Sequence, residues 1–199
     1  GADINEFTTI DDVDEAYSLI RQGQQVLDAL EALSCPTVAV INGYTLGGGL
    51  ELAMACNYRL AYNNDKSIIG LPEVQLGLHP GFGGTVRAVR LVGVRAAMKL
   101  MLTGKSIRVS AARKIGLVDR LCNAEEWQNQ ARELVNTQPK LSTAPFLEKI
   151  LNLAIFRGFI AKTLSKQVKS KAKQAHYPAP YAMIKLWKVN GASQKTAYK

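Results

Sequence analysis

Two glutamates in glycine-rich surroundings are the residues of this chain best placed for acid–base chemistry. Glu51 comes two residues after the triplet Gly47-Gly48-Gly49, in the apolar run from Leu50 to Cys56. A carboxylate in such a helix has no obvious solvated face, and burial would raise its pKa toward neutrality, the range useful for proton transfer. The alternative is an ordinary first-turn glutamate favoured by the helix dipole.

Glu73 follows Pro72 in a second glycine-rich segment, which runs from Leu71 to Thr85. Standing alone, Glu73 would be interpreted as an exposed loop carboxylate. Two carboxylates that converge on one water molecule can divide a proton transfer between them. Glu51 and Glu73 are therefore a candidate pair, and their convergence depends on how the chain folds.

The glycine triplet is a candidate for stabilising negative charge. Glycines at a helix N-terminus leave backbone N–H groups unpaired and let another molecule approach closely. Such donors form an oxyanion hole, and losing one raises a reaction barrier by about 3 kcal/mol. The alternative is a turn needed only for tight packing of a strand against a helix. The segment is neither a dinucleotide fingerprint nor a P-loop, because it lacks G-x-G-x-x-G and Gly-Lys-Ser/Thr.

Hydrophobic periodicity predicts the elements that must position these residues. We expect a long amphipathic helix from Val13 to Leu33 and, after Pro36, a buried strand from Thr37 to Ile41. The other predicted elements are a helix from Leu50 to Cys56, extended segments at 58–62 and 67–70, and helices at 84–91, 95–102, 110–115 and 124–137. Strands alternate with helices, so the fold class is α/β. Only helical patterns follow the boundary between Pro139 and Pro145.

Composition narrows the class of protein. The chain has 199 residues, of which 47% are apolar and 21% charged, as in a folded globular domain. No apolar run approaches the roughly 18 residues of a membrane span. Cys35, Cys56 and Cys122 are odd in number and far apart, so we expect reduced thiols of the cytoplasmic type and no metal site.

The formal net charge of +9 favours anionic partners, without choosing among phosphates, nucleic acid and an acidic membrane surface. Much of the excess lies in one stretch that contains Arg157, Lys162, Lys166, Lys169, Lys171 and Lys173. The same stretch has an expected apolar face of Phe156, Phe159, Ile160 and Leu164. The simplest interpretation is a solvated helix face beside a packed one.

Three motifs, taken together, resemble those of the enoyl-CoA hydratase/isomerase, or crotonase, family. They are Gly1-Ala2-Asp3-Ile4, the G-x-x-x-G-G-G-x-E-L segment that contains Glu51, and the P-E-x-x-L-G-x-x-P-G-x-G-G-T segment that contains Glu73. The likeness continues through Leu102-Thr103-Gly104 to Val118-Asp119. The tail, with Tyr177-Pro178-Ala179-Pro180, is similar to the hydratase part of multifunctional fatty-acid oxidation α subunits.

The resemblance implies a role for each motif residue. Glu51 and Glu73 would be the acid–base pair that adds water to a 2-enoyl-CoA, with Glu73 as the proton donor to C2. The backbone N–H groups of Ala2 and Gly48 would form the oxyanion hole. Further substrate contacts would come from Gly1, Asp3, Ile4, Gly47, Gly49, Pro72 and Gly81. No cofactor or metal is implied, because the thioester is itself the electron sink and coenzyme A is part of the substrate.

The family fold implied by the resemblance is a crotonase-like superhelix of ββα units. It normally begins with strands that this chain lacks, so we expect a truncated hydratase core over 1–139 and a helical segment over 140–199 that leads toward a following domain. Asn57 stands where many members have Asp. The basic stretch acquires a second interpretation here, as a surface for the phosphates of coenzyme A.

The resemblance also suggests partners and rival functions. Implied partners are an acyl-CoA, further copies of the chain, or a β-oxidation complex with dehydrogenase and thiolase activities, whereas nucleic acid is not expected. Family isomerases typically rely on the second glutamate alone, so the presence of both favours hydration. The alternatives are Δ3-Δ2 enoyl-CoA isomerisation and a non-catalytic module that binds RNA or a partner. We expect a cytoplasmic location.

Overall fold

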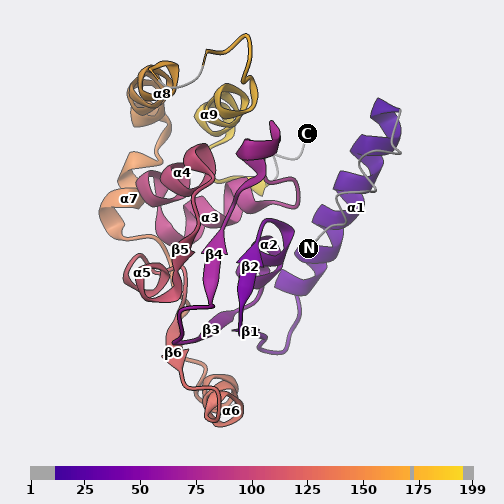
Figure 1. Cartoon of the computed structure of the whole chain (residues 1–199), viewed down its shortest axis with the longest axis vertical. Coiled ribbons are helices and arrows are strands. Elements are labelled where there is room, and N and C mark those ends of the chain that lie inside the picture. Colours follow the sequence, from indigo (N-terminus) through magenta and orange to yellow (C-terminus); the bar gives the residue numbers. More distant parts are fainter. Residues whose placement is uncertain (1–11, 171–172, 195–199) are drawn as a thin grey trace.

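The computed structural model describes residues 12–170 and 173–194 (Figure 1). The candidate residues Gly1, Ala2, Asp3 and Ile4 lie outside this range. The first half contains α1 (Val13–Glu31), β1 (Val38–Ile41), β2 (Tyr44–Leu46), α2 (Gly48–Ala55), β3 (Tyr58–Tyr62), β4 (Ile68–Gly70), the 3₁₀ turn η2 (Glu73–Leu76) and α3 (Gly84–Val92). The second contains α4 (Val94–Thr103), β5 (Ile107–Arg108), α5 (Val109–Lys114), β6 (Arg120–Cys122), α6 (Trp127–Thr137), α7 (Phe146–Leu151), α8 (Ala154–Lys169) and α9 (Ala179–Asn190).

The strands of the described residues form two small sheets. In the first, β3 lies between β1 and β6, and both pairings are parallel. In the second, β4 lies between β2 and β5, parallel to β2 and antiparallel to β5. Because β2 and β4 are parallel neighbours, the segments that leave their carboxyl ends begin at the same edge of the sheet.

The sequence pattern did not predict three of these strands. They are β2, β5 and β6, which have three, two and three residues. An alternating pattern needs about four residues to be recognised, so such short strands are defined by their neighbours in the sheet. The 3₁₀ turn at Glu73 was likewise missed, and α2 begins two residues before the predicted Leu50, since the carbonyl of Gly47 already accepts from Leu50 and Glu51.

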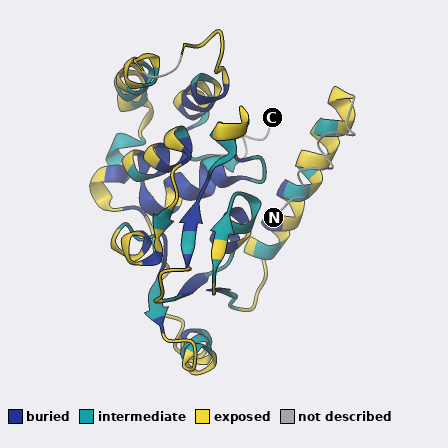
Figure 2. Cartoon of the chain, in the orientation of Figure 1, coloured by how far each residue is buried: buried dark blue, intermediate teal, exposed yellow. Residues whose placement is uncertain are grey.

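Helices cover the sheets on several sides and enclose the core. The main hydrophobic cluster joins residues of α2, α3 and α4 to strand residues, and α9 adds Met183, Ile184 and Trp187. A second cluster lies under α6, where Leu134 packs with Tyr58, Leu60 and Cys122. Buried residues lie toward the interior of the molecule, and the outer surfaces of the helices are exposed (Figure 2). The helical tail thus shares the main core, and the domain boundary near residue 139 stays a prediction.

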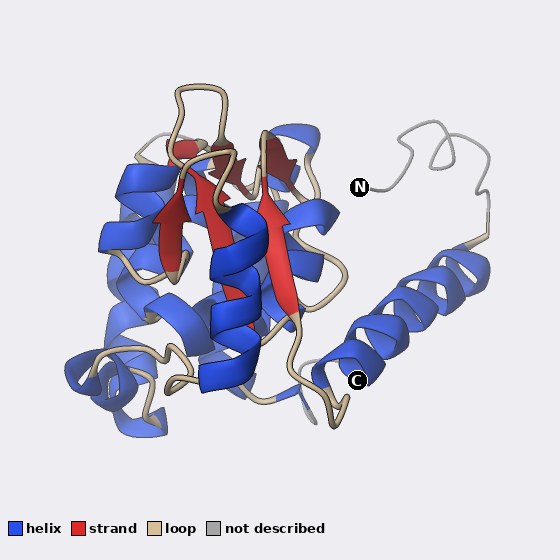
Figure 3. Ribbon diagram, turned by 90° about the horizontal axis from the view of Figure 1, so that it is seen from below, coloured by secondary structure: helices blue, strands red, loops and turns tan. Residues whose placement is uncertain are grey.

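Helix α1 reaches away from the rest of the molecule (Figure 3). Of its residues, only Gln24 and Leu27 are buried, and both lie in its second half. The side chain of Asp12 caps its start by accepting from the N–H of Asp14. Apolar side chains on the outer surface of α1, among them Val13, Tyr17 and Val26, are exposed.

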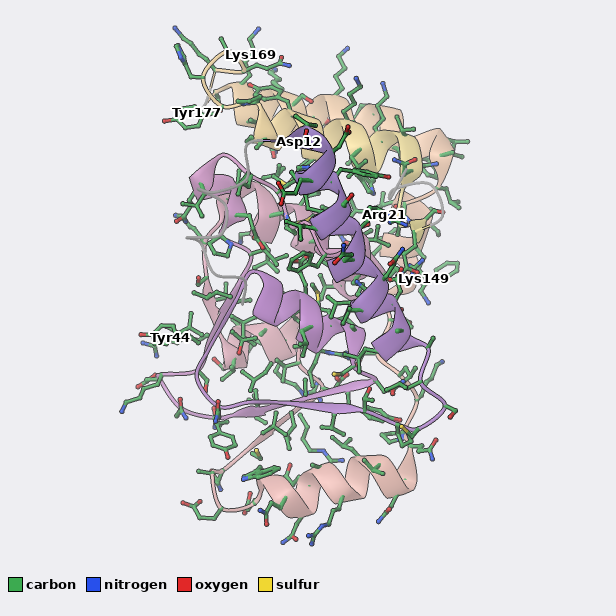
Figure 4. All side chains as sticks on the ribbon, turned by 90° about the vertical axis from the view of Figure 1, so that its right-hand side faces the viewer. Asp12, Arg21, Tyr44, Lys149, Lys169 and Tyr177 are labelled. Carbon is green, nitrogen blue, oxygen red and sulfur yellow. The ribbon has the colours of Figure 1, made fainter. Side chains whose placement is uncertain are left out.

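The basic stretch forms α8, which packs against α9 at one end of the molecule, where Figure 4 labels Lys169 and Tyr177. Its apolar face was predicted only in part. Ile160 and Leu164 pack against the core, whereas Phe159 is 77% exposed and Phe156 is 39% exposed. The prediction was wrong for these two because α8 rests on α9 along one narrow side.

A buried ion pair ties β3 to the segment before β6. The Nη2 atom of Arg59 lies 2.6 Å from Oδ2 of Asp119, and the two side chains are 2% and 9% exposed. The same oxygen accepts from the backbone N–H of Arg59, and the hydroxyl of Ser142 donates to Oδ1. Asp119 therefore compensates a buried guanidinium and joins three segments of the chain.

Replacing Asp119 with asparagine is expected to lower the free energy of unfolding by about 3 kcal/mol, because it leaves the Arg59 charge buried without a counter-charge. Urea denaturation followed by circular dichroism measures this. The matched control is Asp65→Asn, which breaks the exposed pair between Asp65 and Arg108 and should change nothing measurable. Equal effects of the two substitutions would contradict the structural role of Asp119.

Candidate active site

Glu51 is a buried carboxylate at the start of α2. Its side chain is 2% exposed, and its Oε1 atom accepts a 2.7 Å hydrogen bond from the backbone N–H of Gly84, the first residue of α3. Gly84 has no room for a side chain, since a Cβ there would lie 2.9 Å from both Cγ and Oε1 of Glu51. The two helix N-termini therefore meet around this carboxylate, and burial follows from the apolar run that the sequence showed.

Burial raises the pKa of Glu51 to about 7. Loss of hydration is the main cause, and the nearby charge of Glu73 raises the pKa further. The backbone N–H of Gly84, the backbone of Phe82 and the charge of Arg87 act in the opposite direction. At neutral pH the group is therefore poised to accept or release a proton, as the sequence had suggested.

Glu73 opens η2, directly after β4. The side chain is half-buried, and neither carboxylate oxygen finds a hydrogen-bond donor within the described part of the chain. Burial raises the pKa of Glu73 above its ordinary value. Its interpretation as an exposed loop carboxylate is therefore wrong, and both oxygens keep an unused capacity to accept hydrogen bonds.

Gly47 links the two glutamates. Its N–H donates to the carbonyl of Gly70 at 3.0 Å, which extends the pairing of β2 and β4, and its carbonyl accepts from the N–H of Glu51 at 3.0 Å. A Cβ on Gly47 would lie 3.1 Å from Oε1 of Glu73. The residue has φ 55° and ψ −127°, which only glycine adopts readily. The glutamates thus approach each other because they follow neighbouring parallel strands.

The glycine triplet forms the N-terminus of α2. Gly47 is the N-cap, and α2 begins at Gly48. Among the described residues, the N–H groups of Gly48 and Gly49 have no hydrogen-bond acceptor. A Cβ on Gly49 would meet no atom of the described residues within 4 Å, so those residues leave this side of the helix start open. The triplet can offer backbone donors and the positive end of the helix dipole to an anionic atom.

The remaining predicted contacts divide into two groups. Pro72 directly precedes Glu73, whereas Gly81 lies in the loop before α3, where its neighbours are Gln24 and Ile20 of α1. The roles assigned to Gly1, Ala2, Asp3 and Ile4 stay predictions, since these residues lie outside the described part.

Sequence reasoning missed Arg87, which supports the loop around Glu51. Its side chain is 2% exposed, donates to the carbonyl of Phe82 at 2.8 Å, and pairs with Asp28 at 2.5 Å and Glu31 at 3.0 Å on α1. Gln24 of α1 also donates to the carbonyl of Gly81 at 2.8 Å. The sequence did contain a signal for Arg87, which is an arginine among the apolar residues of a helix. A charged side chain at such a position needs buried partners.

The burial of Glu51 makes the stability of the protein depend on pH. The unfolded carboxyl titrates near 4.5 and the folded one near 7, so the folded state binds the proton more tightly. Stability from this group is complete below the lower value and is lost as the pH rises through the upper one. Relative to Glu51→Gln, the wild type should therefore lose about 2 to 3 kcal/mol of unfolding free energy between pH 5 and pH 8.

Urea denaturation of wild type and Glu51→Gln at both pH values measures this difference. The control is Glu125→Gln at an exposed turn, which removes a carboxylate without changing a buried group. Parallel pH trends in wild type and Glu51→Gln would show that Glu51 does not titrate in a buried site.

Two parallel strands thus bring a buried and a half-buried carboxylate to the glycine-rich start of α2. This arrangement suits acid–base catalysis beside a site that stabilises an anion. Comparison with known proteins agrees with this interpretation of the site. The enoyl-CoA hydratase/isomerase family model matches residues 1–182. The chain belongs to this family.

Two kinds of relative support the assignment. The chain is 44% identical to the fatty acid oxidation complex subunit alpha of Shewanella loihica, over 92% of this chain and 26% of that protein. It therefore spans about a quarter of that relative's length. Among solved structures, an enoyl-CoA hydratase of Bacillus anthracis gives a TM-score of 0.62 at 30% identity, over 84% of this chain and 60% of the other. DspI of Pseudomonas aeruginosa gives 0.63 at 34%, over 69% and 55%. The crotonase-like α/β fold is confirmed.

Proposed function

We propose that this chain is an enoyl-CoA hydratase, which adds water reversibly across the double bond of a 2-enoyl-CoA. The observation that carries the proposal is the presence of both Glu51 and Glu73 at one edge of the β2–β4 sheet, beside the open N-terminus of α2. The relative from Shewanella loihica is a fatty acid oxidation complex subunit, and this supports an acyl-CoA as the substrate.

In the proposed reaction, the two carboxyl groups together hold one proton. As the water oxygen bonds to C3, its proton passes to Glu51, and the electron pair of the double bond moves onto the thioester oxygen. Glu73 then gives its proton to C2 while the thioester carbonyl is restored. The proton has moved from Glu73 to Glu51, and exchange between the groups resets the site. Burial raises the pKa of both groups, that of Glu51 to about 7, and this favours the sharing of one proton between them.

The enolate oxygen needs donors while it carries charge. We assign the N–H of Gly48, at the start of α2, as one donor, and the N–H of Ala2 as the other. The helix dipole adds to the attraction, because the oxygen would lie on the axis of α2 at its positive end. The proposal requires neither metal nor redox cofactor, since the thioester itself accepts the electron pair.

Direct assay separates hydration from its nearest rival. Crotonyl-CoA absorbs through its conjugated enoyl thioester, so hydration is followed as a loss of this absorbance. Isomerisation of a 3-enoyl-CoA would appear as a gain. The proposal predicts rapid loss with crotonyl-CoA. If absorbance rises with the 3-enoyl substrate and does not fall with crotonyl-CoA, the chain is an isomerase and the hydratase proposal is wrong.

The setting of the enzyme is part of the same proposal. We infer that the chain acts within a fatty acid oxidation complex, on the strength of the relative's name. A reducing, cytoplasmic compartment is supported by Cys35, Cys56 and Cys122, which are free thiols in the structure. Within the described residues, none of the helices is long and apolar enough to cross a membrane.

A further inference from the structure

Helices α4, α7, α8 and α9 lie together at one end of the molecule (Figure 1). A cavity lined by residues of these four helices lies away from the two glutamates. Its cavity volume is about 700 Å³, within the range of small-molecule sites. The lining includes neither glutamate nor any residue of the glycine triplet. This cavity, called here the α4–α8 groove, is therefore separate from the candidate active site.

Two apolar stripes line the groove. Ile160, Leu164 and Val168 follow one another at intervals of four residues, so they lie on one side of α8. Met98 and Leu102 are spaced in the same way on α4 and form the opposite wall. Since α8 packs mainly against α9 and α7, the space between it and α4 stays open. The walls fit a narrow aliphatic chain better than a polar ligand.

The groove carries positive charge along its α4 wall. Arg95 and Lys99 lie one turn apart and both line the cavity. Arg95 is paired with the buried Glu148, with Nε 2.5 Å from Oε1, whereas Lys99 forms no ion pair within the described residues. Residues 140–173 contain eight lysines and arginines and a single acidic residue, Glu148, so the surroundings add to the positive potential.

We propose that the α4–α8 groove binds a fatty acid anion, with its aliphatic chain between the two apolar stripes and its carboxylate at Lys99. The groove offers a partner to both parts of such a ligand, the apolar chain and the carboxylate. An inorganic anion would leave the apolar stripes unused, and a neutral hydrocarbon would leave the lysine unused. The proposal does not depend on the hydratase assignment, because the groove shares no lining residue with the glutamate site.

Calorimetric titration with decanoate, below its micellar concentration, tests the proposal. Wild type and Glu51→Gln should bind one decanoate with equal affinity, unaffected by crotonyl-CoA. Leu164→Trp, which places a ring in the groove, should weaken binding at least tenfold. Lys99→Glu should weaken decanoate about tenfold and leave 1-decanol unchanged. The matched control Lys162→Glu alters an exposed lysine of α8 that does not line the groove, and should have little effect.

Three results would overturn the proposal. They are the absence of saturable decanoate binding, displacement of decanoate by crotonyl-CoA, and equal weakening by Lys99→Glu and Lys162→Glu. If Leu164→Trp fails to fold by circular dichroism, a photoreactive fatty acid and peptide mapping replace it. Labels on α4 and α8 support the groove, and labels confined to other elements refute it.

Discussion

Glu51→Gln and Glu73→Gln should each slow crotonyl-CoA hydration by two to four orders of magnitude, the usual contribution of a general acid or base. Glutamine keeps the size of the side chain and can still accept the hydrogen bond from Gly84, but it cannot take up or release a proton at neutral pH. The rate constant kcat should fall far more than KM changes, because neither group is needed to hold coenzyme A.

Folding must be separated from chemistry in this experiment. Both variants should keep the wild-type circular dichroism spectrum, and Glu51→Gln should be relatively more stable at pH 8. The matched control is again Glu125→Gln, an exposed glutamate, which should retain full activity. A folded variant at either glutamate with near wild-type kcat would remove that residue from the proposed mechanism.

Gly84→Ala should lower hydration by about a hundredfold although it replaces no catalytic side chain. The new methyl group would lie 2.9 Å from Cγ and Oε1 of Glu51 and from Cβ of Pro80, so we expect the carboxylate to shift and its hydrogen bond from Gly84 to be distorted. A displacement of this kind, near 1 Å, is enough to cost about two orders of magnitude. Steady-state kinetics with crotonyl-CoA measures the effect.

The control for this substitution is Gly158→Ala at an exposed position within α8, where an added Cβ meets no described residue within 4 Å. It should leave hydration unchanged and stabilise the helix by about 0.5 to 1 kcal/mol. If Gly84→Ala is folded and as active as Gly158→Ala, the contact between Gly84 and Glu51 does not position the carboxylate.

The nature of Glu51 could be predicted from its neighbours, whereas its pairing with Glu73 could not. An apolar run without breakers is a local signal, and it correctly indicated a buried carboxylate. Convergence of the glutamates depends on the parallel pairing of β2 with β4, and β2 is too short to show a pattern. Long-range pairing of short strands leaves little trace in a single sequence.

The residues that support the site could not be predicted from the sequence, for a related reason. Arg87 contacts Asp28 and Glu31, more than fifty residues earlier in the chain. The sequence showed a long amphipathic helix at that place, and the structure agrees, but periodicity does not tell which element faces the acidic residues. Similarly, Phe156 and Phe159 fit an apolar helical face by spacing, and only the position of α9 shows that they stay exposed.

The arrangement around Glu51 lowers the stability of the fold and gives the carboxyl a pKa that suits proton transfer. Keeping a carboxylate buried costs about 3 kcal/mol when it ionises, from the shift of its pKa to about 7. The ion pairs of Arg87 and the hydrogen bond from Gly84 hold the carboxylate in place despite this cost. A site that needed only a stable fold would gain from an uncharged residue here.

Hydration by the double variant Glu51→Gln/Glu73→Gln, compared with both single variants, tests the central claim that the two carboxylates act as one unit on one water molecule. The account predicts a double variant within a few-fold of the slower single variant, because either loss already stops the shared proton transfer. A double variant slowed by the product of the two single effects would contradict it, since the glutamates would then act independently.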